Sequence, residues 1–93
     1  MGLKDAPMVA NHDGIAVRVE SHSAVVGGFF RLYVNDECLD EGPCTLTETA
    51  VLRAPCPGAD DDRFVVARIT MNWRKTEVKL EIGGEPVEMQ PQA

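Results

Sequence analysis

The chain has 93 residues, of which 44% are hydrophobic and 26% are charged. This length and balance suit one globular domain, residues 1–93, and exclude a disordered or fibrous chain. Fifteen acidic residues against nine basic ones give a net charge of −6, which repels nucleic-acid phosphates and anionic membrane surfaces. We therefore expect neither nucleic acid nor a membrane as a partner.

The sequence also predicts a cellular location. No apolar run approaches the roughly 20 residues that span a bilayer, and residues 1–10 lack the basic start and long apolar stretch of a secretory signal. The cysteines Cys38, Cys44 and Cys56 are an odd number, so they cannot all pair within one chain. These features favour a reducing, cytoplasmic compartment.

The first third of the chain predicts an arm and two strands. Residues 1–13 have no sustained period and are typical of an N-terminal arm. Residues 15–20 alternate apolar and polar side chains, as a half-buried strand does. Residues 24–34 predict a longer strand, in which the pair Gly27 and Gly28 indicates a bulge or bend.

The middle of the chain predicts a hairpin and a separate strand. Asn35 and Asp36 indicate a turn, after which residues 37–40 fold back as the second arm of a hairpin. Residues 46–53 are rich in threonine and valine, which favours a strand. Two prolines close that strand, because proline cannot donate to a ladder.

The last third gives the clearest pattern. Apolar side chains occupy every second position of residues 63–73, which predicts a strand. Residues 76–82 alternate in the same way and lead into the hairpin turn Gly83-Gly84. Residues 85–89 form the return arm, where Pro86 indicates a sheet edge. Residues 90–93 are expected to be a loose tail.

Seven short strands without a helix predict an all-β fold. The spacing of strands and turns favours a small antiparallel β-sandwich, with a small β-barrel as the alternative. The lack of crossover helices excludes the doubly wound nucleotide-binding folds. We find no internal repeat, and the hairpin motifs identify no family.

The chemistry-bearing side chains form weak patterns. The three cysteines lie six and twelve positions apart, whereas zinc ligands typically pair two to four residues apart. No base or cation stands beside a cysteine to activate it, and no nucleophile-elbow motif is present. We predict no catalytic residue, no cofactor and no metal ligand, although an enzyme with scattered residues stays a third hypothesis. The alternative function is a small-molecule or metal-binding domain that uses the loops around Cys44, Cys56, Asp60, Asp61 and Asp62.

The most informative feature is that two predicted strands carry apolar residues on both faces. One face of each strand enters the core, and alternation turns the other face outward. Aromatic and arginine side chains are enriched at the centres of protein interfaces. The leading hypothesis is a non-enzymatic sandwich that binds a protein partner, or a second copy as a homodimer, through an outer sheet face. The predicted contact residues are Phe29, Arg31, Tyr33, Phe64, Val66 and Arg68. In the competing interpretation, a loop, the N-terminal arm or the glycine bulge covers these side chains.

Overall fold

The computed structural model describes residues 7–23, 28–44, 49–57, 63–71 and 76–91. These ranges form nine strands: β1 (Met8–His12), β2 (Ile15–Ser23), β3 (Gly28–Val34), β4 (Glu37–Cys44), β5 (Thr49–Pro55), β6 (Phe64–Met71), β7 (Thr76–Ile82), β8 (Glu85–Val87) and β9 (Gln90–Pro91). The described ranges contain no helix, and so none that is long and apolar enough to cross a membrane.

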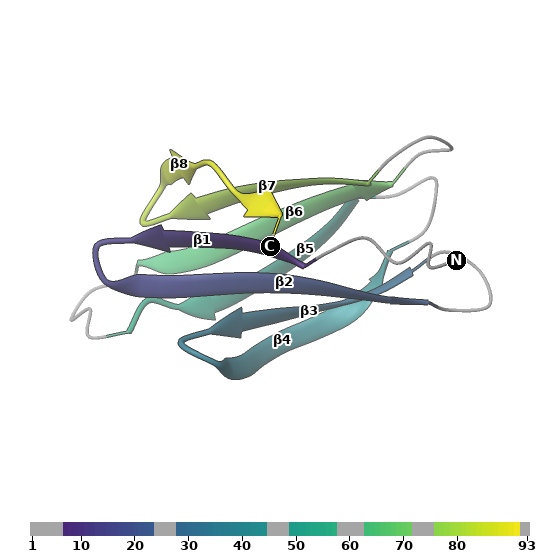
Figure 1. The fold of residues 1–93 in the computed structure, drawn as a ribbon, viewed down its shortest axis with the longest axis horizontal. Helices are drawn as coiled ribbons and strands as arrows, with labels where there is room; N and C mark the ends of the chain where they lie inside the picture. The colour runs from purple at the N-terminus through teal and green to yellow at the C-terminus, as the bar shows by residue number, and fades with distance from the viewer. Residues whose placement is uncertain (1–6, 24–27, 45–48, 58–62, 72–75, 92–93) are drawn as a thin grey trace.

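The strands form two antiparallel sheets. Sheet A has the order β4-β3-β2-β1-β9, and sheet B has the order β5-β6-β7-β8. In Figure 1 the two sheets overlap, with β1 and β2 drawn in front of β5 and β6. The chain passes from sheet A to sheet B after β4 and returns before β9. The predicted antiparallel β-sandwich is confirmed, and its seven predicted strands correspond to β2 through β8.

Two further strands stand where an arm and a tail were predicted. Strand β1 pairs with β2 along its whole length, from Met8 opposite Val19 to His12 opposite Ile15. Strand β9 pairs in turn with β1. Only Ala10 of β1 is buried, so this strand has no clear apolar period. Its backbone hydrogen bonds to β2 hold it in place, and a pattern of side chains does not reveal them.

Strand β4 is longer than predicted and continues past Pro43 to Cys44. The arm was predicted to cover residues 37–40 only, but β4 is the edge of sheet A, where the missing N–H of Pro43 costs no ladder hydrogen bond. A bulge lies opposite Leu32 and Tyr33, because Asp40 pairs with the first and Cys38 with the second. Of the pair Gly27 and Gly28, where a bulge or bend was predicted, Gly28 begins β3 and Gly27 lies outside the described residues.

Three two-residue turns connect the hairpins. Both central residues of each turn have positive φ, as type I′ turns require. The values are 51° and 79° at Asp13 and Gly14, 51° and 66° at Asn35 and Asp36, and 62° and 85° at Gly83 and Gly84. These turns match the right-handed twist of their strands. The register is unbroken in the β1–β2 and β7–β8 hairpins, whereas the β3–β4 hairpin shifts at its bulge.

Asp40 joins the open edges of the two sheets. Its Oδ2 accepts a hydrogen bond from the backbone N–H of Arg53 in β5 at 3.0 Å. Its Oδ1 accepts one from the backbone N–H of Glu41 at 2.9 Å. One carboxylate thus closes the side of the sandwich where β4 lies beside β5.

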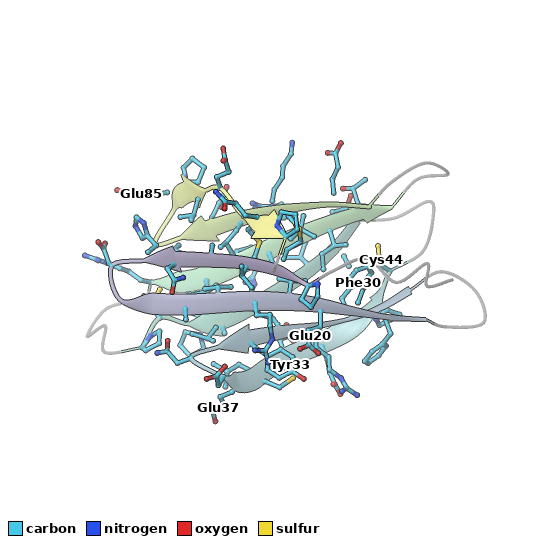
Figure 2. All side chains as sticks on the ribbon, viewed as in Figure 1. Glu20, Phe30, Tyr33, Glu37, Cys44 and Glu85 are labelled. Atoms are coloured by element: carbon cyan, nitrogen blue, oxygen red, sulfur yellow. The ribbon has the colours of Figure 1, made fainter. Side chains whose placement is uncertain are left out.

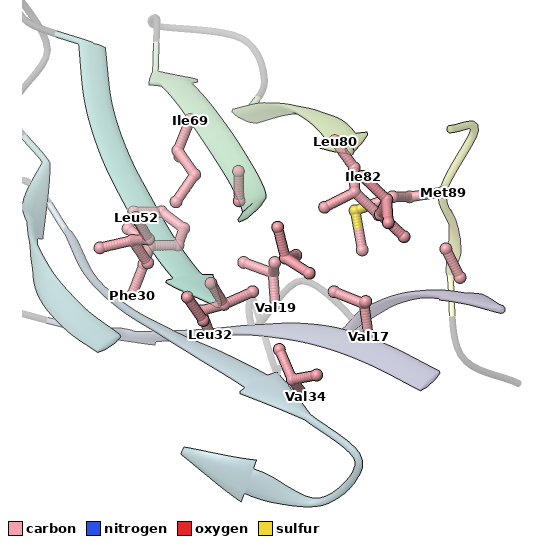
Figure 3. Packing of buried hydrophobic residues seen from close by; sticks show 14 of the residues in the cluster. Val17, Val19, Phe30, Leu32, Val34, Leu52, Ile69, Leu80, Ile82 and Met89 are labelled. Atoms are coloured by element: carbon pink, nitrogen blue, oxygen red, sulfur yellow. The ribbon is translucent and has the colours of Figure 1, made fainter. Parts of the chain in front are cut away.

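The core lies between the sheets and is entirely apolar (Figure 3). Alternate residues of the central strands are buried in it, and no described polar or charged side chain is buried. The larger core residues are Val17, Val19, Phe30, Leu32, Val34, Leu52, Val65, Ile69, Leu80 and Ile82. The predicted inward faces of β3 and β6 are therefore confirmed over these residues. Trp73 was predicted on the same inward face and lies outside the described residues.

Candidate functional site

The structure places the six predicted contact residues on two opposite surfaces. Phe29, Arg31 and Tyr33 lie on the outer face of sheet A, whereas Phe64, Val66 and Arg68 lie on the outer face of sheet B. Each set of three is brought together, but the two sets are separated by the whole thickness of the sandwich. The sequence hypothesis placed all six residues on one outer face, whereas the structure places them on two.

Face A denotes the outward side chains of sheet A, centred on Phe29, Arg31 and Tyr33. The guanidinium carbon of Arg18 lies 4.3 Å from the centroid of the Tyr33 ring. That of Arg31 lies 5.9 Å from the centroid of Phe29. A cation over an aromatic face is attracted by the ring quadrupole, and both rings are only half exposed. Face A thus covers its aromatic rings with its own arginines.

The arginines of face A are themselves held by carboxylates. Arg18 Nε lies 2.8 Å from Glu20 Oε2 and Arg18 Nη1 lies 3.4 Å from Asp36 Oδ1. The Nε contact is an ion pair rather than an aligned hydrogen bond, since this nitrogen is buried without a hydrogen-bond partner. Figure 2 shows Glu20 and Tyr33 close together over β2 and β3.

Arg31 is fixed in the same way. Its Nε donates to Glu41 Oε1 at 3.1 Å. A hydrogen bond with the Tyr33 side chain, and then the negative charge of Glu41, raise the pKa of Arg31.

Face B denotes the outward side chains of sheet B, centred on Val51, Arg53, Phe64, Val66 and Arg68. Cross-strand pairing sets Val51 beside Arg68, Arg53 beside Val66 and Pro55 beside Phe64. Phe64 and Val51 are 42% and 43% exposed, more than any other large hydrophobic residue described. No described cation lies over Phe64.

The charges of face B are less completely paired than those of face A. Arg68 Nη1 contacts Glu81 Oε1 at 3.1 Å. Arg53 and Lys79 form no ion pair with any residue that the structure describes. The sequence hypothesis did not include Val51, Arg53 and Lys79. Their outward alternation in the strands over residues 46–53 and 76–82 was visible, but their position beside β6 depends on sheet order.

The two cysteines of the alternative hypothesis, Cys44 and Cys56, lie at opposite ends of the ladder between β5 and β6. Cys44 is buried and donates through its thiol to the carbonyl of Ile69 at 3.5 Å, near the end of β6 where Ile69 pairs with Ala50. The backbone N–H of Cys56 bonds to the carbonyl of Arg63 at the opposite end of the same ladder. None of the three cysteines forms a disulfide. Asp60, Asp61 and Asp62 lie outside the described residues. Within the described ranges, no three His, Cys, Asp or Glu residues come together as metal ligands.

A cleft of about 410 Å³ lies at the end of the sandwich where the turns after β1 and β7 meet the end of β5. Its polar lining includes His12, Asp13, Arg63 and Glu85, and Cys56 is part of its wall. His12 Nε2 lies 3.4 Å from Asp13 Oδ2 and 3.8 Å from Glu85 Oε2. A volume in this range with a few convergent polar groups is typical of small-ligand sites.

Comparison with known proteins adds no family to this description. No protein-family model, no curated protein and no solved structure matches the chain. The two outer faces and the end cleft are therefore the features from which a function is argued.

Proposed function

We propose that this domain is a non-enzymatic protein-contact module and that face B is its contact surface. The observation that carries the proposal is the exposure of Phe64 and Val51, at 42% and 43%, beside Arg53 and Lys79, which have no ionic partner among the described residues. An interface centre of this kind offers apolar area together with donors that a partner can pair.

Face A supports the choice by contrast. It carries Phe29 and Tyr33, but Arg31 and Arg18 already lie over their rings. A partner that stacked on the face of the Tyr33 ring would have to displace Arg18, which is itself bound by Glu20. A partner at Phe64 would displace only water, so the same contact area favours binding at face B.

Two folded double variants test the proposal. Val51→Ser with Phe64→Ser removes the apolar centre of face B, and Phe29→Ser with Tyr33→Ser is the matched change on face A. Each chain is immobilised, and the proteins that it retains from a lysate of its source are quantified by mass spectrometry. We expect proteins retained by the unchanged chain to be lost with the face B variant and kept with the face A variant. Loss with the face A variant alone, or no change with either, contradicts the proposal.

A second function is favoured by the end cleft, namely the binding of a small polar molecule. Ile15 is half-buried in the cleft wall, and Ile15→Trp would fill the space. Native mass spectrometry of the purified protein is expected to show a bound small molecule that this variant lacks. A bare chain mass, together with no change in melting temperature across a panel of metabolites, would remove this function.

A further inference from the structure

We propose that face B binds face A of a second copy of this chain, with Phe64 entering a hollow beside Tyr33. This inference rests on the proposed function of face B and names its partner. Because the two faces point in opposite directions, a bound pair of copies still has one face A and one face B open, on its two outer sides. The contact therefore stacks copies head to tail.

The hollow is the first observation that supports this partner. It has a volume of about 230 Å³ and lies over the paired β1, β2 and β3. Its lining includes the apolar side chains of Val9 and Ala16 together with Tyr33, Arg18 and Asp36. An exposed aromatic side chain fits such a hollow, and Phe64 is the exposed aromatic of face B. An apolar residue that fits a pocket elsewhere on the same molecule forms a heterologous contact.

Charge supports the same pairing. Among described side chains, face B carries Arg53, Arg68 and Lys79 against Glu77 and Glu81, which leaves it one positive charge in excess. On face A the carboxylates outnumber the cations by one, since Arg18 and Arg31 face the acidic side chains of Glu20, Asp36 and Glu41.

The cations of face B that have no ionic partner among the described residues can contact an acidic side chain at the hollow of face A. Asp36 lines the hollow, and its side chain is 92% exposed. It can accept an additional cation such as Arg53 while it keeps its contact with Arg18.

The same charges disfavour a symmetric dimer through face B. A two-fold axis would bring Arg53 and Lys79 of both copies into one interface, where like charges oppose binding. Face A is also better prepared as an acceptor, since its rings and arginines are already held in place. Less side-chain freedom is lost when such a surface binds.

The faces are large enough for this contact. The molecule extends 41 by 27 Å across its two longer axes, so one broad side offers at most about 1,100 Å². A standard protein interface buries roughly 800 Å² per partner. One face can therefore hold a specific contact without help from the edges of the sandwich.

The test uses two variants that each block one face. Val51→Ser with Phe64→Ser blocks face B. Ala16→Arg blocks face A, because Ala16 is exposed at the hollow and arginine fills it and repels the cations of face B. Pro57→Arg adds the same charge at an exposed turn and serves as the control. Thermal melting first shows that each variant is folded, and sedimentation velocity then measures mass against concentration.

The unchanged chain and the Pro57→Arg control are expected to grow beyond a dimer as concentration rises. The face B variant alone should associate roughly 100-fold more weakly, since about 3 kcal/mol of apolar contact is lost. Ala16→Arg alone should weaken association at least as much, because its side chain fills the hollow and repels the cations of face B. An equimolar mixture of the two blocked variants should form a one-to-one dimer that grows no further, because one intact face A meets one intact face B. This rescue is the distinguishing result.

Two results would overturn the proposal. In the first, the unchanged chain stays monomeric at the highest attainable concentration. In the second, association is lost with one blocked variant but not the other, or the mixture fails to restore a dimer. If the lysate experiment still shows proteins retained through face B, the stacking inference fails and the proposed function stands. If it shows none, both fail.

Discussion

Faces A and B come from the same local pattern, yet they differ in what surrounds it. In each case a central strand turns an aromatic residue and an arginine outward at even spacing. On face A the neighbouring strands supply Arg18 to cover Tyr33 and Glu41 to hold Arg31. On face B the cross-strand neighbour of Phe64 is Pro55, and no described cation lies over the ring, which is 42% exposed. The comparison teaches that an outward aromatic side chain indicates a contact surface only when its cross-strand neighbours leave it uncovered.

The largest expected effect is loss of the fold, and with it of both faces. Ile69 is fully buried at the centre of β6, and Ile69→Asp would place an unpaired charge in the core. We expect the chain to lose its cooperative thermal transition. Thr70→Asp, one position along and exposed on face B, is the control and should melt normally. A cooperatively melting Ile69→Asp protein would show that the register of β6 is wrong.

The next effect sharpens the contrast between the faces. Phe29→Ser with Tyr33→Ser removes two half-buried rings and their cation contacts. We expect the free energy of unfolding to fall by about 2 to 3 kcal/mol, with the fold kept. Urea denaturation of the isolated chain measures this. An unchanged midpoint would mean that the arginines do not cover these rings in solution.

A smaller effect tests the hydrogen bond that joins the edges of the two sheets. Asp40→Ala removes the acceptor for the backbone N–H of Arg53. The site is exposed, so water replaces part of the bond and the loss should be about 1 kcal/mol. Asp40→Asn keeps one acceptor oxygen and should recover part of it. Equal midpoints for all three chains in urea would show that the two sheet edges are held together by other contacts.

The smallest effect is expected on face B. Val51→Ser with Phe64→Ser changes side chains that are already largely exposed, so the free energy of unfolding should fall by less than about 1 kcal/mol. A loss as large as that of the face A variant would place these residues among the structural ones. The comparison would then collapse, and with it the main support for face B as a contact surface.

The sequence was sufficient for the fold class and most strands, but not for the ends of the chain. Val65, Ala67 and Ile69 alternate so regularly that the buried face of β6 was predictable. Strand β1 has no such pattern, since its position depends on hydrogen bonds to β2 rather than on burial. The candidate contact residues were likewise predictable in part. The outward direction of Phe29 and Phe64 was predictable from alternation, whereas their separation onto opposite surfaces depends on sheet order, which no local pattern encodes.

The carboxylate of Asp40 also bears on how this protein avoids aggregation. An open strand edge is a template for adding further strands, and uncontrolled addition leads to fibres. Because the Asp40 carboxylate from β4 accepts the hydrogen bond of the Arg53 N–H on the open edge of β5, an incoming strand would find one hydrogen-bond donor of that edge already taken. The bulge in β4 beside the same residue further disturbs the regular spacing that such a strand needs. Edge growth is thereby opposed on the side of the sandwich where β4 lies beside β5.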